Sequence, residues 1–401
     1  MIDLEILPEK NVIDDGFLDL IGGEFATHEQ GLAEWLKNSS DAMLVADPTP
    51  RFGTILLRFT DGQAATSPVF ECIDFVGMTL QDIETGFKIW GRLSGHDERL
   101  GISGGYGIGG KFYMRQMFKS STLIAYSGGH LNIFGFDRNH AYGYGHGYRN
   151  RIMGFQQALR LADIDSLDRI DTVGDAGTSG RRGFSVFRGI GPKGIGKKID
   201  VITICQRLRS HPQAQRPLKL YRVCVIHNGL VVIERLKPRR IPRKPGFERP
   251  WVRRIPMTLV RKNGTTGDVA HLGRYSGISG TLRLFVSSES LVQRGKMTSL
   301  NRIDFMGRDG VIASYRIDEL GVDVPYGGSI FGECNLPEWD ASEGYLALKT
   351  RDRLVDSPES SALLQWVGAQ VKLFSKMILR RVPEPRGEVD PAGGELVRSG
   401  E

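Results

Sequence analysis

The chain has 401 residues, of which 40% are hydrophobic and 25% are charged, and its formal net charge is +7. The length is about twice that of a typical domain and the composition can form substantial cores, so we expect two folded domains rather than a fibrous or wholly disordered chain. No apolar run reaches the roughly 18 residues that span a bilayer, and the N-terminus lacks a basic, apolar signal sequence. We therefore expect a cytoplasmic protein without a membrane partner.

The cysteines are isolated in the sequence, at Cys72, Cys205, Cys224 and Cys334. No two of them have the C-x-x-C spacing of a zinc site, and their number does not suggest a disulfide framework. We expect them to be reduced residues of the core.

The first informative segment covers residues 34–42, where Glu34, Asn38 and Asp41 fall at i, i+4 and i+7 on one helical face. Apolar residues on the opposite face can anchor this helix in a core: Leu32, Trp35, Leu36 and Met43. Facing a cleft, the polar stripe would suit phosphate and metal chemistry. Facing water, it would be the solvated side of an ordinary amphipathic helix.

Two further segments follow. An apolar run at residues 69–73 predicts a strand that delivers Asp74 into a turn, followed by a helix over residues 79–86. Asp74 can accept a hydrogen bond from an exocyclic amine.

Residues 104–112 read Gly-Gly-Tyr-Gly-Ile-Gly-Gly-Lys-Phe, and such glycines free backbone N–H groups to curl around an anion at a helix start, where Lys111 adds a charge. Alone, this glycine segment is weak evidence for a phosphate site, because the chain has 51 glycines and the P-loop spacing is absent. The order and spacing of the three segments together are the stronger evidence.

Later segments predict mainly strands. We expect strands at 122–126, 131–136 and 183–187, an amphipathic helix at 198–209, a polar linker at 211–215, and another strand at 280–286. The alternating run 218–233 around Asn228-Gly229 predicts a hairpin. The segment 139–148 is rich in His, Tyr and Gly; we interpret it as a hairpin tip, with a metal or stacking site as the alternative.

The three early segments together resemble the GHKL ATPases, the superfamily of DNA gyrase B, MutL, Microrchidia proteins, the large heat-shock chaperones and sensor histidine kinases. The helix resembles their N box, which implies that Glu34 activates the attacking water and that Asn38 coordinates the magnesium bridging the phosphates. Asp41 matches the third polar position. Asp74 and the turn to Gly77 and Met78 correspond to the adenine motif D-x-G-x-G, one residue shorter and without its first glycine.

The glycine segment resembles the Y-G-x-G-x-K phosphate lid of Microrchidia-like members, which implies phosphate contacts from Gly105, Tyr106, Gly107, Ile108, Gly109, Gly110 and Lys111. Gly177-Thr178 resembles a further element in which a Thr touches the adenine side, so Thr178 is a candidate; the alternative is a polar turn. Histidine kinases need a phosphoacceptor hairpin upstream, for which 33 residues leave no room, so the other branches are favoured.

Residues 350–354, Thr-Arg-Asp-Arg-Leu, resemble an S-R-E-x-L segment that points an Arg at the γ-phosphate in chaperone-like members. This implies that Arg351 stabilises charge on the transferring phosphoryl group. Lys349, Arg353 and Lys296 are substitutes for that role, and the alternative interpretation is a surface helix start.

The resemblance implies an α+β protein with three parts. A Bergerat-type ATP-binding α/β sandwich would cover residues 1–212, a transducer-like (ribosomal-protein-like) α/β domain would cover 213–383, and a disordered tail would cover 384–401. The cofactors would be ATP and Mg2+, and ATP hydrolysis to ADP and phosphate would drive a conformational switch with an ATP-dependent homodimer. The output would pass to DNA in genome defence or repair, to a client protein, or to a separately encoded effector. Chaperone-like protein remodelling and a nucleotide-sensing scaffold with weak hydrolysis are the alternatives.

A basic stretch at residues 237–245 supplies the nucleic-acid candidates Arg239, Arg240, Arg243 and Lys244, and it continues to Arg249, Arg253 and Arg254. The positive net charge also favours an acidic partner. A solvated basic loop or a protein-binding surface would have the same composition.

Overall fold

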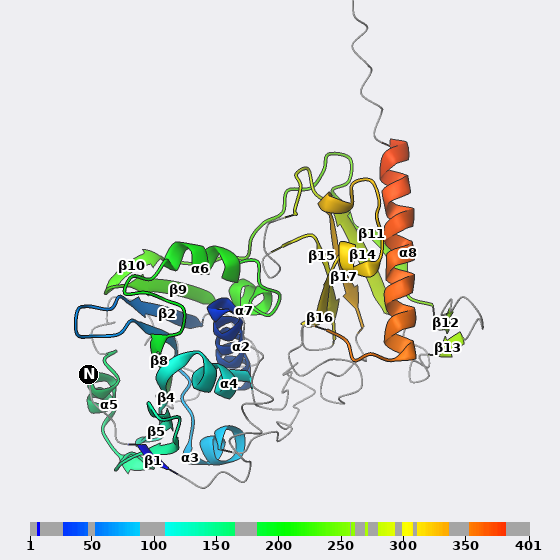
Figure 1. Ribbon diagram of the computed structural model, residues 1–401. Coiled ribbons are helices and arrows are strands. Elements are labelled where there is room, and N and C mark those ends of the chain that lie inside the picture. The colour runs from blue at the N-terminus through cyan, green and yellow to red at the C-terminus, as the bar shows by residue number, and fades with distance from the viewer. Residues whose placement is uncertain are drawn as a thin grey trace, which may run out of the picture.

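The structure is a computed structural model and describes residues 6–8, 27–46, 53–88, 109–164, 183–256, 258–260, 269–271, 280–292, 299–307, 311–336 and 353–381. Within these residues the chain forms two units, each built on its own large β-sheet with helices packed on it (Figure 1). The fold class is α+β, as the sequence predicts.

The first unit is built on a sheet of ten strands: β1 (Ile6–Pro8), β2 (Thr54–Thr60), β3 (Val69–Asp74), β4 (Phe118–Ser127), β5 (His130–Phe136), β6 (Tyr142–Gly145), β7 (Arg151–Ile152), β8 (Gly183–Pro192), β9 (Arg222–His227) and β10 (Leu230–Ile233). Their order is β1-β6-β5-β4-β8-β3-β2-β9-β10, with β7 paired to β5. Neighbouring strands are antiparallel except β2 and β9, which are parallel. The strands predicted at 69–73, 122–126, 131–136 and 183–187 all lie in this sheet.

Both faces of this sheet are covered by helices. Successive side chains of a strand point to opposite faces, so the sheet contributes to two separate cores. In β2, Ile55, Leu57 and Phe59 belong to one core and Leu56 to the other. Helices that contribute to the first core or pack beside it are α2 (His28–Ala46), α4 (Gly109–Gln116), α6 (Val201–Leu208) and α7 (Gln215–Leu220); α5 (Phe155–Leu161) packs into the second. A short helix α3 (Leu80–Asp82) and a π-helical turn η1 (Ile83–Phe87) follow β3, in place of the regular helix predicted over 79–86.

The hairpin around Asn228-Gly229 is confirmed, but it belongs to the first unit. Both turn residues have positive φ, 50° and 79°, which is the geometry that an Asn-Gly turn favours. β9 pairs with β2 from Thr54 opposite Arg222 to Phe59 opposite His227. The expected boundary at residue 212 therefore falls inside the first unit, because the next apolar strand completes that sheet and its core.

The segment 139–148 is a hairpin tip only at its start: residues 139–141 belong to the turn between β5 and β6, which the pair Phe136–Tyr142 closes. Residues 142–145 form β6, which pairs with β5, and the side chains of Tyr142 and Tyr144 are buried. Both rings lie within 5 Å of Phe134, at centroid distances of 4.5 and 4.7 Å. The aromatic residues of this segment therefore serve packing.

The second unit is a five-stranded sheet covered by one long helix. Its strands are β11 (Trp251–Arg254), β14 (Thr281–Val286), β15 (Arg302–Met306), β16 (Val311–Arg316) and β17 (Ile330–Asn335), in the order β11-β14-β17-β15-β16. The predicted strand at 280–286 is β14. Two 3-10 turns, η3 (Asp318–Leu320) and η4 (Gly327–Ser329), connect strands, and β12 (Thr258–Val260) pairs with β13 (Val269–His271) in a separate ribbon.

Helix α8 (Pro358–Arg381) covers one face of this second sheet (Figure 1). Ser357 caps its start, since its Oγ accepts a hydrogen bond from Ser360 N at 3.1 Å. A buried apolar stripe at spacings of three and four residues packs onto the strands: Leu363, Val367, Val371, Phe374 and Ile378. Among the described residues, no helix is long and apolar enough to cross a membrane.

Candidate functional site

The polar stripe predicted at residues 34–42 lies on helix α2. The helix starts with half of a capping box, in which Thr27 N donates to Gln30 Oε1 at 3.2 Å. The predicted apolar side is buried in the first core, whereas Glu34 and Asn38 are only half-buried. The apolar side therefore fixes the helix and leaves the polar side facing the neighbouring elements.

The start of helix α4 lies directly against this polar stripe. A Cβ atom added to Gly109 would lie 2.8 Å from Glu34 Oε1, and one added to Gly110 would lie 3.1 Å from Asn38 Nδ2. Glycine at both positions lets the backbone of α4 come this close without displacing either side chain. The first N–H groups of a helix have no partner within it and attract anions. A helix N-terminus, a carboxylate and a carboxamide thus meet at one place.

Asp74 ends strand β3 as a buried, oriented acceptor. Its Oδ2 accepts a hydrogen bond from Ser39 Oγ at 3.0 Å, and its Oδ1 accepts one from Val76 N at 3.2 Å. The Gly77 backbone and the Ser185 side chain also donate to it. Burial outweighs these contacts and raises the pKa of Asp74 to about 6. The carboxyl is therefore mostly ionised at neutral pH.

The turn after Asp74 requires glycine at position 77. Gly77 has a φ of +85°, and a Cβ there would lie 2.1 Å from the carbonyl oxygen of Tyr126. Met78 is partly buried against the first core. The turn is thus held against β4, immediately beside the Asp74 carboxyl.

Lys111 lies in the first turn of α4 and is buried. Its Nζ donates to the carbonyl oxygen of Gly86 at 3.2 Å, which ties α4 to η1. Burial lowers the pKa of Lys111 to about 7. Asp41, the third position of the stripe, pairs instead within its own helix, with Lys37 Nζ at 3.0 Å.

Two serines were missed by the sequence analysis. Ser39 follows Asn38 directly, but its position does not fit the i, i+4, i+7 stripe. Ser185 lies opposite Asp74 in the pairing of β3 with β8. Strand pairing between residues more than 100 positions apart leaves no local signal, so only the contact itself identifies Ser185.

Several predicted site residues lie outside the described residues: Gly105, Tyr106, Gly107, Ile108, Thr178, Lys296, Lys349 and Arg351. The described residues contain no group of three or more His, Cys, Asp or Glu side chains that could hold a metal ion. Arg353, a substitute for Arg351, is described, and it forms a two-pronged ion pair with Glu319, at 2.7 and 2.9 Å.

The predicted basic stretch lies in the connection between β10 and β11. Three of its four candidates contact the second unit: Arg239 with Glu289, Arg243 with Phe285 and Phe331, and Lys244 with Tyr326. The Arg243 guanidinium carbon lies 3.6 Å from the Phe285 ring centroid, and burial lowers its pKa. Arg240 is exposed. The stretch is therefore largely packed onto the second sheet rather than fully solvated.

No family model and no curated protein matches the chain. Among solved structures, the ATPase region of Saccharomyces cerevisiae topoisomerase II is similar, with 11% identity, a TM-score of 0.37, and coverage of 86% of this chain and 84% of that one. The same region bound to ICRF-187 (dexrazoxane) has 10% identity, a TM-score of 0.38, and coverage of 88% and 85%. Scores and identities this low do not assign the chain to a family.

Proposed function

We propose that this chain binds ATP with Mg2+ and hydrolyses it to ADP and phosphate as a conformational switch of the GHKL type. One observation carries the proposal: the polar side of α2 contacts both of the other motif segments. Glu34 and Asn38 meet the start of α4, and Ser39 is bonded to Asp74. Two segments that are separate in sequence thus flank α2, which supports a nucleotide site at this helix.

At the adenine end, Asp74 would accept a hydrogen bond from the exocyclic amine. Its carboxyl is oriented by Val76 N and Ser39 Oγ.

At the phosphate end, the N-terminus of α4 would hold the anion, with Lys111 adding charge from the same turn. The carboxamide of Asn38 lies beside that helix start, and its oxygen is a ligand type that Mg2+ accepts. When bound, Mg2+ supplies positive charge that neutralises the phosphate oxygens. A Cβ at Gly109 or Gly110 would press on Glu34 or Asn38, so glycine at both positions keeps these side chains in place.

Glu34 would orient and activate the attacking water. We expect Glu34→Ala to retain ATP affinity while turnover falls by about 10²-fold or more, the range for loss of a general base. Glu234→Ala, which removes an exposed carboxylate, is the matched control. Fluorescent-nucleotide binding and single-turnover hydrolysis would separate the two quantities, and a wild-type rate in Glu34→Ala would remove it as the base.

A nucleotide-sensing scaffold is the second candidate, and the surroundings of Asp74 favour it. Four protein groups already donate to this carboxyl, so adenine would have to displace a serine hydroxyl. A wild-type protein that binds ATP but shows no measurable turnover would establish this candidate and exclude the first.

We further propose that the first unit is the Bergerat-type ATP domain, that the second is transducer-like, and that Arg351 acts on the γ-phosphate from it. The switch would work in the cytoplasm through an ATP-dependent homodimer and would act on DNA, a client protein or a separately encoded effector. Three exposed residues favour DNA: Arg240, Arg253 and Arg254. Reversing these three to Glu should abolish salt-sensitive DNA retention while ATP affinity persists. Equal DNA retention by the reversed variant would remove DNA from the proposal.

A further inference from the structure

Arg302 is a buried guanidinium that connects the two units. It begins β15, and each of its nitrogens has a different acceptor. Nε donates to Asp304 Oδ1 at 2.7 Å and Nη1 to Ser299 O at 2.9 Å, both within the second unit. Nη2 donates to Ser210 O of the first unit at 2.7 Å. A buried arginine with three fixed acceptors holds the orientation of both sides.

On the first unit, Arg302 contacts the C-terminal end of helix α6. Ser210 and His211 continue that end, with backbone N–H groups bonded to Arg207 O and Leu208 O. A cation is favoured there by the helix dipole. The connection between the units meets the same place, because the Arg239 backbone N–H donates to Arg209 O.

The contact between the two units at Arg302, Ser210 and His211, here called the joint, is buried, but one of its polar atoms has no hydrogen bond. His211 is buried, and its Nδ1 has no hydrogen-bond partner among the described residues. Burial, together with the charge of Arg302, lowers the pKa of His211 to about 3, so the ring is neutral beside the guanidinium. Buried ion and polar contacts are often no more stabilising than apolar packing, and in some proteins they specify one arrangement over others.

Helix α6 leads directly to the proposed nucleotide site. Arg207 Nη1 lies 3.2 Å from Glu29 Oε1, and Glu29 is buried in the first turn of α2. Ile204, Cys205 and Leu208 share the first core with Leu32 and Leu36 of α2. Through these contacts, a shift of the end of α6 would act on the helix that carries Glu34 and Asn38.

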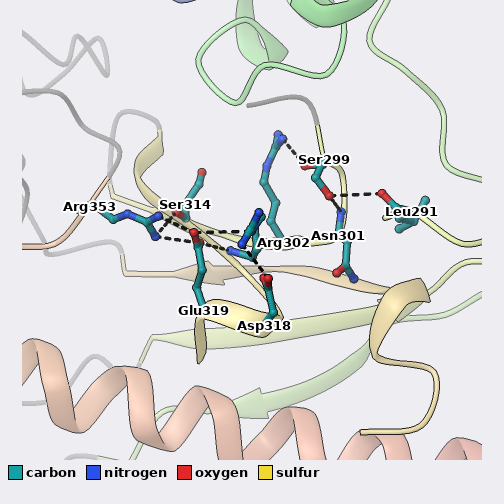
Figure 2. Close-up of polar contacts among 9 residues, drawn as sticks. Leu291, Ser299, Asn301, Arg302, Ser314, Asp318, Glu319 and Arg353 are labelled. Atoms are coloured by element: carbon teal, nitrogen blue, oxygen red, sulfur yellow. Dashed lines mark hydrogen bonds and ion pairs between the residues drawn. The ribbon is translucent and has the colours of Figure 1, made fainter. Parts of the chain in front are cut away.

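In the second unit the contacts of Arg302 continue toward residue 353. Asp304 Oδ1 also accepts from Ser314 Oγ at 2.7 Å, and Ser314 O accepts from Arg353 Nη1 at 3.3 Å. Figure 2 shows Arg353 facing Glu319, and Arg302 beside Ser299. Arg353 lies two positions after Arg351, so this network begins close in sequence to the proposed phosphate-sensing residue.

We propose that Arg302 is a positioning residue that couples the second unit to the nucleotide site through the end of helix α6. This rests on the proposed ATPase function and assigns its regulation. Because the coupling acts on the placement of α2, which carries the proposed base Glu34, it should affect the turnover step more than binding. By linkage, nucleotide binding should also alter the joint.

The first experiment compares Arg302→Met with Arg283→Met, a control that removes an exposed ion pair with Glu333 on the same sheet. We expect Arg302→Met to keep affinity for a non-hydrolysable ATP analogue within about 3-fold and to lose at least about 10-fold in kcat, while Arg283→Met matches wild type. Arg302→Lys should restore little, because an ammonium cannot reproduce the three-way donor geometry. If Arg302→Met does not fold, Ser314→Ala would replace it, because this change removes only one contact to Asp304. It should also lower kcat, but by less than is expected for Arg302→Met.

Two readouts distinguish coupling from a merely structural role. Hydrogen exchange at Ser210 and His211 should slow on addition of the analogue in wild type, and this response should vanish in Arg302→Met although the analogue binds. In a double-mutant cycle with Glu29→Gln, the effects on kcat should be strongly non-additive.

The proposed coupling would be overturned by any one of three results. These are a wild-type kcat in folded Arg302→Met, effects on kcat that simply multiply in the double-mutant cycle, and a hydrogen-exchange response in Arg302→Met that equals that of wild type. Failure of the wild-type protein to bind or hydrolyse ATP would instead overturn the proposed function, so the two failures are distinct.

Discussion

Gly109→Ala tests the site by moving the proposed base without removing it. The added Cβ would lie 2.8, 2.9 and 3.0 Å from Oε1, Cδ and Cγ of Glu34, and ordinary contact begins at 3.4 Å. The carboxylate must therefore retreat by about 0.6 Å, the difference between 3.4 and 2.8 Å. Misplacement on the order of 1 Å costs about 10²-fold in rate. We expect kcat to fall by about 10- to 100-fold.

The stability of Gly109→Ala should not fall together with its kcat. Alanine is favoured over glycine within a helix by about 0.5–1 kcal/mol, and the clashing atoms belong to the end of a flexible side chain. Chemical denaturation should thus show a free energy of unfolding at or above that of wild type. Gly154→Ala at the start of α5, where nothing lies within 4 Å of the new Cβ, is the control for a glycine replacement at a helix start.

Single-turnover hydrolysis and nucleotide titration would be measured for Gly109→Ala, Glu34→Ala and the double variant. Because Gly109→Ala acts through Glu34, it should have no further effect once Glu34 is absent. The reasoning is refuted if folded Gly109→Ala hydrolyses ATP at the wild-type rate. It is also refuted if the two losses multiply, since the glycine would then act on another group.

Asp74→Asn should weaken ATP binding by about 10- to 150-fold, corresponding to about 1.5–3 kcal/mol for a hydrogen bond to a charged group; calorimetry on the folded variant checks this. The pKa of Asp74 is raised to about 6, so ATP affinity should fall as pH drops below 6, where this acceptor is protonated. The pKa of Lys111 is lowered to about 7, so ATP affinity should also fall as pH rises above 7, where the ammonium deprotonates. An ATP affinity that stays constant from pH 5 to 9 would contradict both roles. Gly77→Ala should destabilise the fold by about 2–6 kcal/mol in urea unfolding, from backbone strain at φ +85° and from the clash with Tyr126 O. Arg351→Ala should cut hydrolysis by about 10²-fold with ATP affinity retained, and normal single-turnover rates there would reassign the trigger.

Local sequence pattern was sufficient for the elements whose signal repeats within a few residues. The apolar and polar faces of α2, the strand ending at Asp74 and the Asn228-Gly229 turn could be read directly, because side-chain period and backbone φ are properties of adjacent residues. The candidate roles of Glu34 and Asn38 came from such spacing together with a family resemblance.

Tertiary structure alone decided which segments meet. Whether the β9–β10 hairpin joined the first sheet or the second depended on a parallel pairing with β2 across more than 160 residues, and its sequence is compatible with either. The same holds for Ser185 beside Asp74, for Gly109 against Glu34, and for Arg302 reaching Ser210. These contacts join residues far apart in the chain, and their stability depends on the burial of both partners, which no short window of sequence contains.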